Sequence, residues 1–176
     1  MLIYEALIGD HRKLQDLMRR LLALPDDAVE VRQDLIEQVR DELIPHSRAE
    51  EAVFYNSIRS VKTAQDLVWH GFEEHMQIET YLRALQSLDE LDAGWRKTAE
   101  KLQEALSFHL NDEENRIIPI AQQMFTDEEA EAMGEAFVKM KPAVRESGFM
   151  QNTLDLIANV LPPRLAAPLR SYTYRV

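Results

Sequence analysis

The sequence predicts an all-α protein, an up-down-up-down four-helix bundle with one or two additional C-terminal helices. Three observations support this fold class. The 176 residues are 45% hydrophobic and include only 5 glycines, which is typical of one compact domain. Residues with high helix propensity predominate along the chain. Apolar residues recur at three- and four-residue spacing in four long segments that short turns separate.

Turn residues delimit the four long helices. The segment "LPDD" ends the first helix and caps the second, and the first helix keeps its apolar spacing if His11 belongs to the inward stripe. Pro45 lies inside the second helix and predicts a kink there. The segment "DELDAG" links the third helix to the fourth, which contains Pro119. The four helices are predicted over about residues 2–24, 29–61, 63–88 and 95–125.

The C-terminal region differs from the bundle in composition. "TDEEAEAMGEAFVKMK" opens with a capping box, Thr126 with Glu129, and predicts a shorter fifth helix. After Pro142 we expect a further helix at about 151–160 and then an extended, Pro-rich tail. We therefore divide the chain into a bundle, 1–125, and a C-terminal region, 126–176.

The tail is basic and the body acidic. Residues 141–176 carry five basic and two acidic side chains, although the whole chain has a formal charge of -11. This asymmetry indicates that the tail packs on the bundle or on a partner subunit, which makes a homodimer an expected assembly. The alternative is a role of the tail in binding another partner or a membrane surface.

Composition excludes several classes of function. The 31 acidic against 20 basic residues argue against nucleic-acid binding, because phosphate contacts need clustered lysine and arginine. The chain has no cysteine, so disulfides, thiolate zinc sites and iron–sulfur clusters are excluded and any metal must be held by nitrogen and oxygen. It shows neither a signal-peptide core nor an apolar run of about 20 residues. We expect a cytoplasmic protein that does not enter a membrane.

The chain contains an internal repeat. "DHRKLQDLMRRLLAL" at Asp10 and "EHMQIETYLRALQSL" at Glu74 align an acidic residue, a histidine and several apolar positions at an offset of 64. "HSRAEEAVF" at His46 and "HLNDEENRI" at His109 align at an offset of 63. Each half of this duplicated helical hairpin contributes one lone histidine and one HxxxE motif.

The repeated motifs predict a metal centre. Helix residues four apart share a face, and helix lengths place the four histidines at similar heights in the bundle. Carboxylates buried at that level must be paired or bound to metal. We predict two ions, with the two glutamates as bridging ligands because carboxylates can bridge. The ligands expected from the first half are His11, His46 and Glu50, and those from the second half are His75, His109 and Glu113, although the halves can mix in space.

The order H, HxxxE, H, HxxxE over residues 11–113, with "DH", "EEAVFY" and "EENRIIPIA" around it, resembles the hemerythrin-like family, the HHE cation-binding domain. The resemblance implies a four-helix bundle with a non-haem diiron centre, bridged by two carboxylates and an oxo or hydroxo species. Such centres bind or sense O2, NO, related redox ligands or iron. Members of the oxygen-carrying branch have two histidines four apart on the third helix. Here Gly71 and Glu79 flank His75 at those positions.

Several alternatives stay open at this point. The donor set favours iron but also suits manganese or zinc. A diiron oxidase, a peroxide-consuming enzyme, or a storage or structural bundle are alternative functions, and the sequence shows no nucleophilic triad or other catalytic residues. His70 and Glu79 are candidates for additional ligands, and Glu51 and Glu114 for orienting the imidazoles. Tyr4 and Tyr55 would supply a phenolate only if the bundle turned unexpectedly.

Overall fold

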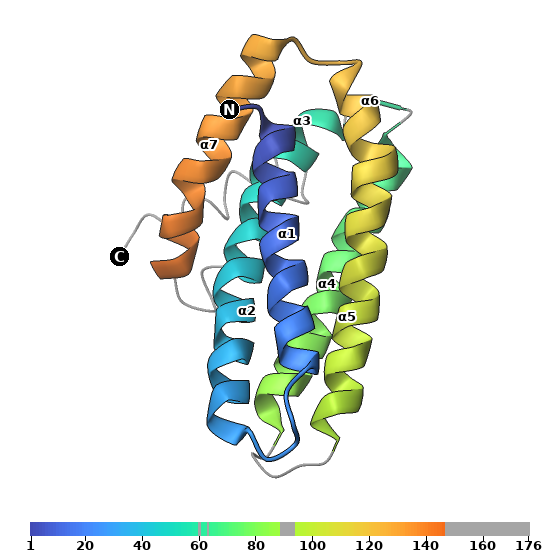
Figure 1. The fold of residues 1–176 in the computed structure, drawn as a ribbon. Coiled ribbons are helices and arrows are strands. Elements are labelled where there is room, and N and C mark those ends of the chain that lie inside the picture. Colours follow the sequence, from blue (N-terminus) through green and yellow to red (C-terminus); the bar gives the residue numbers. More distant parts are fainter. Residues whose placement is uncertain (60, 63, 89–93, 147–176) are drawn as a thin grey trace, which may run out of the picture.

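The computed structural model describes residues 1–59, 61–62, 64–88 and 94–146. Every regular element in those residues is helical, which confirms the all-α prediction (Figure 1). The predicted helix at 151–160 and the tail lie outside the described residues. The elements are α1 (Ile3–Leu22), α2 (Val29–Glu50), η1 (Glu51–Tyr55), α3 (Asn56–Ile58), α4 (Gln65–Ser87), α5 (Trp95–Asp112), η2 (Glu113–Ile117), α6 (Ile118–Gln122) and α7 (Asp127–Glu146), where η marks a π-helix.

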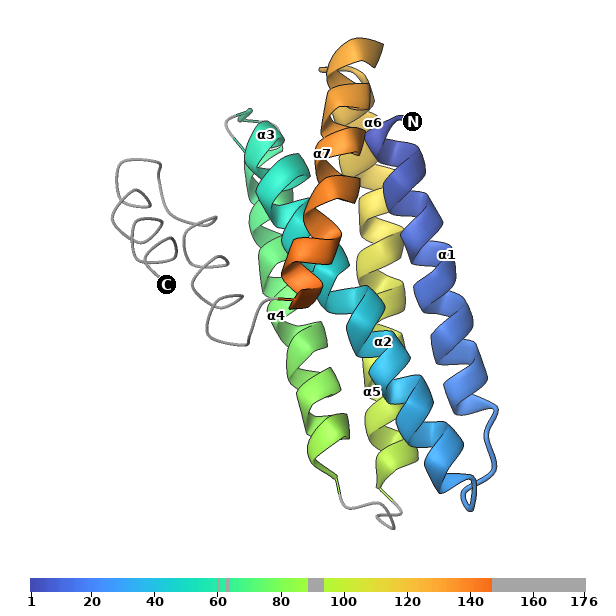
Figure 2. The same ribbon diagram turned by 90° about the vertical axis from the view of Figure 1, so that its left-hand side faces the viewer.

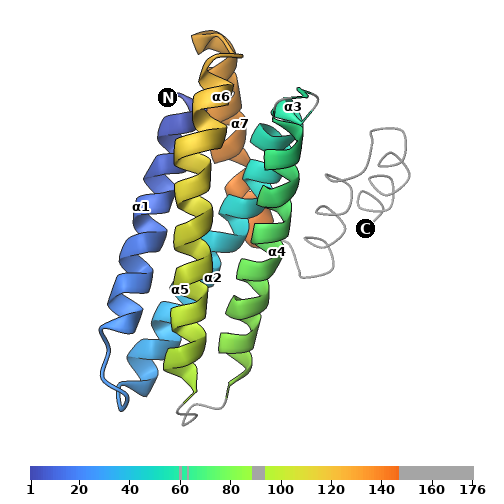
Figure 3. The same cartoon turned by 90° about the vertical axis from the view of Figure 1, so that its right-hand side faces the viewer.

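The four predicted long helices form an antiparallel bundle (Figure 1). α1 packs on α2, and α4 packs on α5. The short elements η1 and α3 extend α2, and η2 and α6 extend α5. α7 packs along the outside of α1 and α2 (Figure 2). Viewed from the opposite side, α4 and α5 cover the face away from α7 (Figure 3).

The observed helices differ from the predicted ones in two respects. A π-helical turn interrupts the second and the fourth of the long helices, directly after or at the glutamate of each HxxxE motif. α7 begins with the predicted capping box, in which Thr126 and Glu129 exchange hydrogen bonds of 2.9 and 3.3 Å. It then continues through Pro142, because proline removes one backbone donor and leaves only the carbonyl of the exposed Val138 without its helical partner.

Two apolar cores lie on either side of one polar layer. On α1, Leu7 belongs to the core nearer the N-terminus of the helix and Leu14 to the other core, and His11 lies between them. On α4, His75 lies between the same two cores. The apolar cores hold the bundle together and bury the polar layer at mid-height. Among the described helices, none is sufficiently long and apolar to span a membrane.

Candidate metal centre

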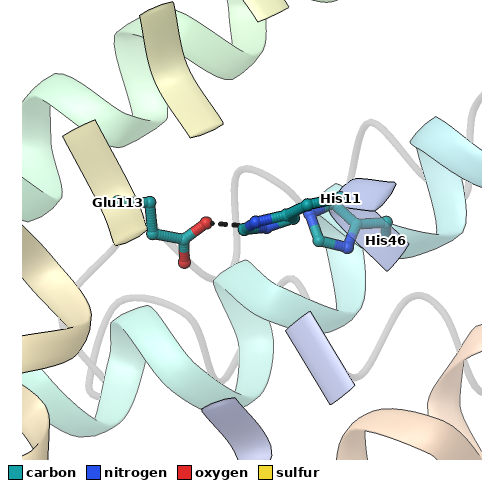
Figure 4. Close-up of side chains that lie close together, drawn as sticks. All are labelled: His11, His46 and Glu113. Atoms are coloured by element: carbon teal, nitrogen blue, oxygen red, sulfur yellow. Dashed lines mark ion pairs between the residues drawn. The ribbon is translucent and has the colours of Figure 1, made fainter. Parts of the chain in front are cut away.

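The four histidines and two glutamates predicted as ligands lie together in the polar layer. Each is at most 1% exposed. Their inward nitrogen and oxygen atoms form two groups, and within each group these atoms lie within 4.8 Å of one another. Group 1 is His11, His46 and Glu113, and group 2 is Glu50, His75 and His109. Figure 4 shows group 1, in which the carboxylate of Glu113 points at the imidazole of His11 and His46 lies beside it.

The two glutamates lie in the opposite groups from those expected if each half of the repeat formed one group. Glu113 lies with the histidines of the first half, where its Oε2 is 3.1 Å from His11 Nε2. Glu50 lies with the second half, where its Oε2 is 3.3 Å from His75 Nε2. The same Glu50 oxygen is 3.5 Å from His46 Nε2 in group 1. Glu50 therefore contacts histidines of both groups, as a bridging carboxylate must.

Each histidine has a carboxylate at its outward nitrogen. In a neutral imidazole, a carboxylate acceptor at Nδ1 favours the tautomer with the hydrogen on Nδ1 and with the lone pair of Nε2 directed into the layer. These pairs always join different helices. The pairs are His11 with Glu114 at 2.8 Å, His46 with Asp10 at 3.4 Å, His75 with Glu51 at 2.9 Å and His109 with Glu74 at 2.9 Å.

Two of these four acids agree with the sequence prediction and two were missed. Glu51 and Glu114 were expected to orient imidazoles, and they do. Asp10 and Glu74 were not singled out, although each directly precedes a lone histidine and aligns in the repeat. An acidic residue conserved in position between the two copies was the available signal.

The buried nitrogen and oxygen atoms of the layer are arranged to bind a cation and not to form hydrogen bonds with one another. Unpartnered buried polar atoms cost about 1–3 kcal/mol each, so a cluster of them needs a compensating ligand. His75 Nε2 and His109 Nε2 face each other at 3.0 Å. Two ligands about 2.1 Å from one ion and at right angles to each other are about 3.0 Å apart. The inward atoms without a hydrogen-bond partner among the described residues are His11 Nε2, His46 Nε2 and both carboxylate oxygens of Glu50 and of Glu113.

Burial and mutual repulsion shift the pKa values in the layer. Burial, followed by the negative charge of Glu113, raises the pKa of Glu50 well above its usual range. Burial also opposes ionisation of Glu113, but the neighbouring Glu50 and His11 side chains lower its pKa. Burial lowers the pKa of His46 to about 4, which keeps this imidazole neutral and able to bind a metal ion.

The π-helical turn η1 brings one additional polar group to the layer. A π-turn contains more residues than an α-turn and so rotates the following side chains, which is frequent at functional sites. Tyr55 ends η1, is fully buried, and stacks on His75 with ring centroids 5.6 Å apart. Within the described part of the chain, its hydroxyl has no hydrogen-bond partner.

Gly71 provides the space for that hydroxyl. A Cβ atom at Gly71 would lie 2.5 Å from Tyr55 Oη and 2.7 Å from two ring carbons. Gly71 stands four residues before His75, at one of the two flanking positions where a second histidine would have been expected. In this chain the phenol of Tyr55 therefore fills the space beside a position that carries no side chain.

The two additional candidates for ligands lie elsewhere. His70 is on the surface, with a side chain 65% exposed, and its Nδ1 is 3.4 Å from Glu73. Glu79 is buried, but its carboxylate binds the guanidinium of Arg48. Arg48 also donates to both oxygens of Glu51, at 3.1 and 3.2 Å. Glu79 thus supports the histidine layer through Arg48 and Glu51 and does not face its interior.

Comparison with known proteins agrees with this geometry. The sequence model of the hemerythrin HHE cation binding domain matches residues 2–121. An uncharacterized hemerythrin-like protein of Schizosaccharomyces pombe is 26% identical over 144 residues, which are 81% of this chain and 70% of that protein. The crystal structure of a hemerythrin HHE cation binding domain-containing protein from Mycobacterium kansasii superposes with a TM-score of 0.74 at 24% identity. That match covers 91% of this chain and 99% of the other, and shows a shared fold.

Proposed function

The chain belongs to the hemerythrin HHE cation-binding domain family, and from this premise we propose that it holds two metal ions, preferably iron, for binding O2, NO or a related redox ligand. One observation carries the proposal. The inward atoms of four histidines and two glutamates converge in a fully buried layer, and most of them have no hydrogen-bond partner among the residues that the structure describes. Manganese and zinc suit the same donors, so iron is chosen for its redox chemistry.

The six residues would form two metal positions. Group 1 would hold one ion and group 2 the other, and the Glu50 carboxylate, which contacts His46 and His75, would join them. The outward carboxylates keep each Nε2 lone pair directed inward and raise the basicity of the imidazole. A bound pair of iron ions would supply one-electron steps and coordination positions for a small ligand.

The balance of donors favours reversible binding over cleavage of O2. The layer presents four neutral imidazoles and only two inward carboxylates. Anionic ligands stabilise high-valent iron more than neutral ones do, so this set suits the lower oxidation states. Phe54, Ile117 and Phe137 are at most 2% exposed and belong to the adjacent apolar core, which keeps bulk water from the layer.

Tyr55 is the next donor to consider in this proposal. Its buried hydroxyl stands among four acidic groups, and burial followed by the charge of Glu50 raises its pKa well above the usual value. A nearby cation reverses that effect, because it stabilises a phenolate. We therefore expect Tyr55 either to bind the ion of group 2 or to donate a hydrogen bond to a small ligand. Loss of a visible phenolate-to-iron absorption band in Tyr55→Phe would distinguish the first role from the second.

Metal analysis tests the proposal directly. Protein purified without added metal should contain two irons per chain, and its absorption spectrum should change on exposure of the reduced form to O2 or NO. His46→Ala should lower the metal content and abolish the spectral change. His70→Ala is the matched control, since His70 is exposed and should leave both unchanged. Less than one metal ion per chain, with no change in His46→Ala, would contradict the proposal.

A further inference from the structure

The four carboxylates that accept hydrogen bonds from the histidine Nδ1 atoms differ in their other partners. Two of them, Asp10 and Glu51, contact a second, cationic partner. The other two, Glu74 and Glu114, form no ion pair with a lysine or arginine among the described residues. The difference matters, because a carboxylate shared with a cation attracts the Nδ1 hydrogen of its histidine less strongly.

Lys141 of α7 is the cation behind Asp10. Its ammonium group contacts Asp10 Oδ2, the same oxygen that accepts from His46 Nδ1. It also donates to Glu42 on α2 at 3.0 Å, and its side chain is only 16% exposed. Lys13 reaches the same two acids from α1, but it is 61% exposed and its charge is therefore screened by water.

Arg48 is the cation behind Glu51. It is buried, and it donates to both oxygens of the carboxylate that accepts from His75 Nδ1. Group 1 and group 2 thus have the same arrangement. In each group one histidine has a carboxylate partner neutralised by a cation, and the other histidine has a carboxylate that keeps its full charge.

The internal repeat does not explain why each group has one carboxylate that is paired with a lysine or arginine. The residue 63 positions after Arg48 is Asn111, so the second half lacks the arginine. Lys141 lies in α7, beyond residues 2–121 that match the family. α7 therefore supplies group 1 with the charge that α2 supplies to group 2.

We propose that Lys141 is a positioning residue for the metal centre. It weakens the attraction of the Asp10 carboxylate for the Nδ1 hydrogen of His46. Arg48 has the same effect on Glu51 and His75. The inference rests on the proposed binding of cations by the two groups. Removing the Lys141 charge leaves Asp10 with only the exposed Lys13 as a cationic partner. Asp10 then attracts the Nδ1 hydrogen of His46 more strongly, so His46 Nε2 becomes more basic, and the repulsion between the ammonium and a bound cation disappears. Both changes strengthen cation binding in group 1 and leave group 2 unaffected.

The test measures Zn2+ affinity in each group separately. His109→Ala removes a ligand of group 2 and so reports on group 1, and His11→Ala reports on group 2. Zn2+ titration of the metal-free proteins, in competition with a chelator, should show that adding Lys141→Gln raises the affinity of group 1 about tenfold. The affinity of group 2 should not change. Lys141→Arg keeps the charge and should retain the original affinity in both, as should Lys139→Gln, which changes an exposed lysine of the same helix.

The direction of the change separates electrostatic moderation from simple support. If Lys141 only holds α7 in place, Lys141→Gln should weaken Zn2+ binding in group 1 or leave it unchanged, and either result overturns the inference. An equal increase in both groups would overturn it too, because the effect would then not pass through Asp10 and His46. Absence of Zn2+ binding in the parent protein is a different outcome and would overturn the proposed function itself.

Discussion

Group 1 and group 2 hold the same kinds of ligand but are supported differently. Behind group 2, Arg48 is buried between the carboxylates of Glu51 and Glu79. Behind group 1, Glu114 is 35% exposed and Lys141 is 16% exposed at the edge of α7. The cation behind group 2 is therefore part of the interior, while the cation behind group 1 remains in contact with solvent.

This difference teaches that a duplicated hairpin can conserve ligands without conserving their surroundings. The charge needed behind one histidine of each group comes from α2 in one case and from an added helix in the other. Buried ion pairs are costly to break, and partly exposed ones are not. The two groups should accordingly respond unequally to equivalent substitutions.

Removing the buried cation should have the largest effect. Arg48→Met leaves Glu51 and Glu79 buried without their guanidinium partner, and we expect it to lower the free energy of unfolding by about 3–5 kcal/mol. Lys141→Gln should cost less, about 1 kcal/mol, because Lys13 still reaches Asp10 and Glu42 in that variant. Urea denaturation of the metal-free proteins measures both. Equal losses in the two variants would contradict the proposed difference between the groups.

The titration of His46 should make the metal-free protein less stable as the pH is lowered from about 6.5 to 4, whereas Glu50, whose pKa is raised, acts in the opposite direction above its unfolded pKa. Burial holds the pKa of His46 at about 4, so the unfolded chain binds a proton between about 6.5 and 4 that the folded chain does not. At about 1.4 kcal/mol per pH unit, this contributes a loss of about 3 kcal/mol over that window. Burial also lowers the pKa of His109, so group 2 contributes with the same sign.

Denaturation at several pH values checks this prediction. His46→Gln should flatten the dependence between pH 6.5 and 4. The pKa of His11 is raised by Glu113 and Glu114 against the effect of burial, so its contribution to stability is constant below about pH 6.5, and His11→Gln should leave the slope between pH 6.5 and 4 unchanged. A His46→Gln profile with the same slope as the parent protein would refute the assignment.

A methyl group at Gly71 should disturb group 2 alone. Gly71→Ala places Cβ within 2.7 Å of the Tyr55 ring, and we expect a loss of about 1–3 kcal/mol in the free energy of unfolding. Gly9→Ala is the control in α1, where a Cβ meets no atom within 4 Å. It should stabilise the helix by about 0.5–1 kcal/mol. Thermal denaturation compares the two, and stabilisation by both would show that Tyr55 does not occupy this space.

Much of the fold and of the site could be predicted from the sequence. The three- and four-residue apolar spacing predicted the long helices, because that spacing is a local property of an α-helix. The repeat predicted that four histidines and two glutamates gather at one level, since equal distances from the turns give equal heights in an antiparallel bundle. Their role as ligands stays a prediction, as do the division at residue 125 and a partner subunit.

The tertiary structure decided which groups meet across helices. The sequence could not assign Glu113 to His11 or Glu50 to His75, because such pairing depends on how each helix is rotated in the bundle. Nor could it reveal the π-turn that directs Tyr55 inward, since one added residue in a turn leaves no mark in the apolar spacing.

Sequence by itself thus determined the helices, the repeated histidines and glutamates, and their common level, because all three follow from spacing along one chain. Only the tertiary structure decided the carboxylate behind each imidazole and the cation behind Asp10. Lys141 lies 131 residues from Asp10 in the chain, and no local pattern relates the two. The physical reason is that helix geometry is set by neighbours in sequence, whereas charge balance in the buried layer is set by neighbours in space.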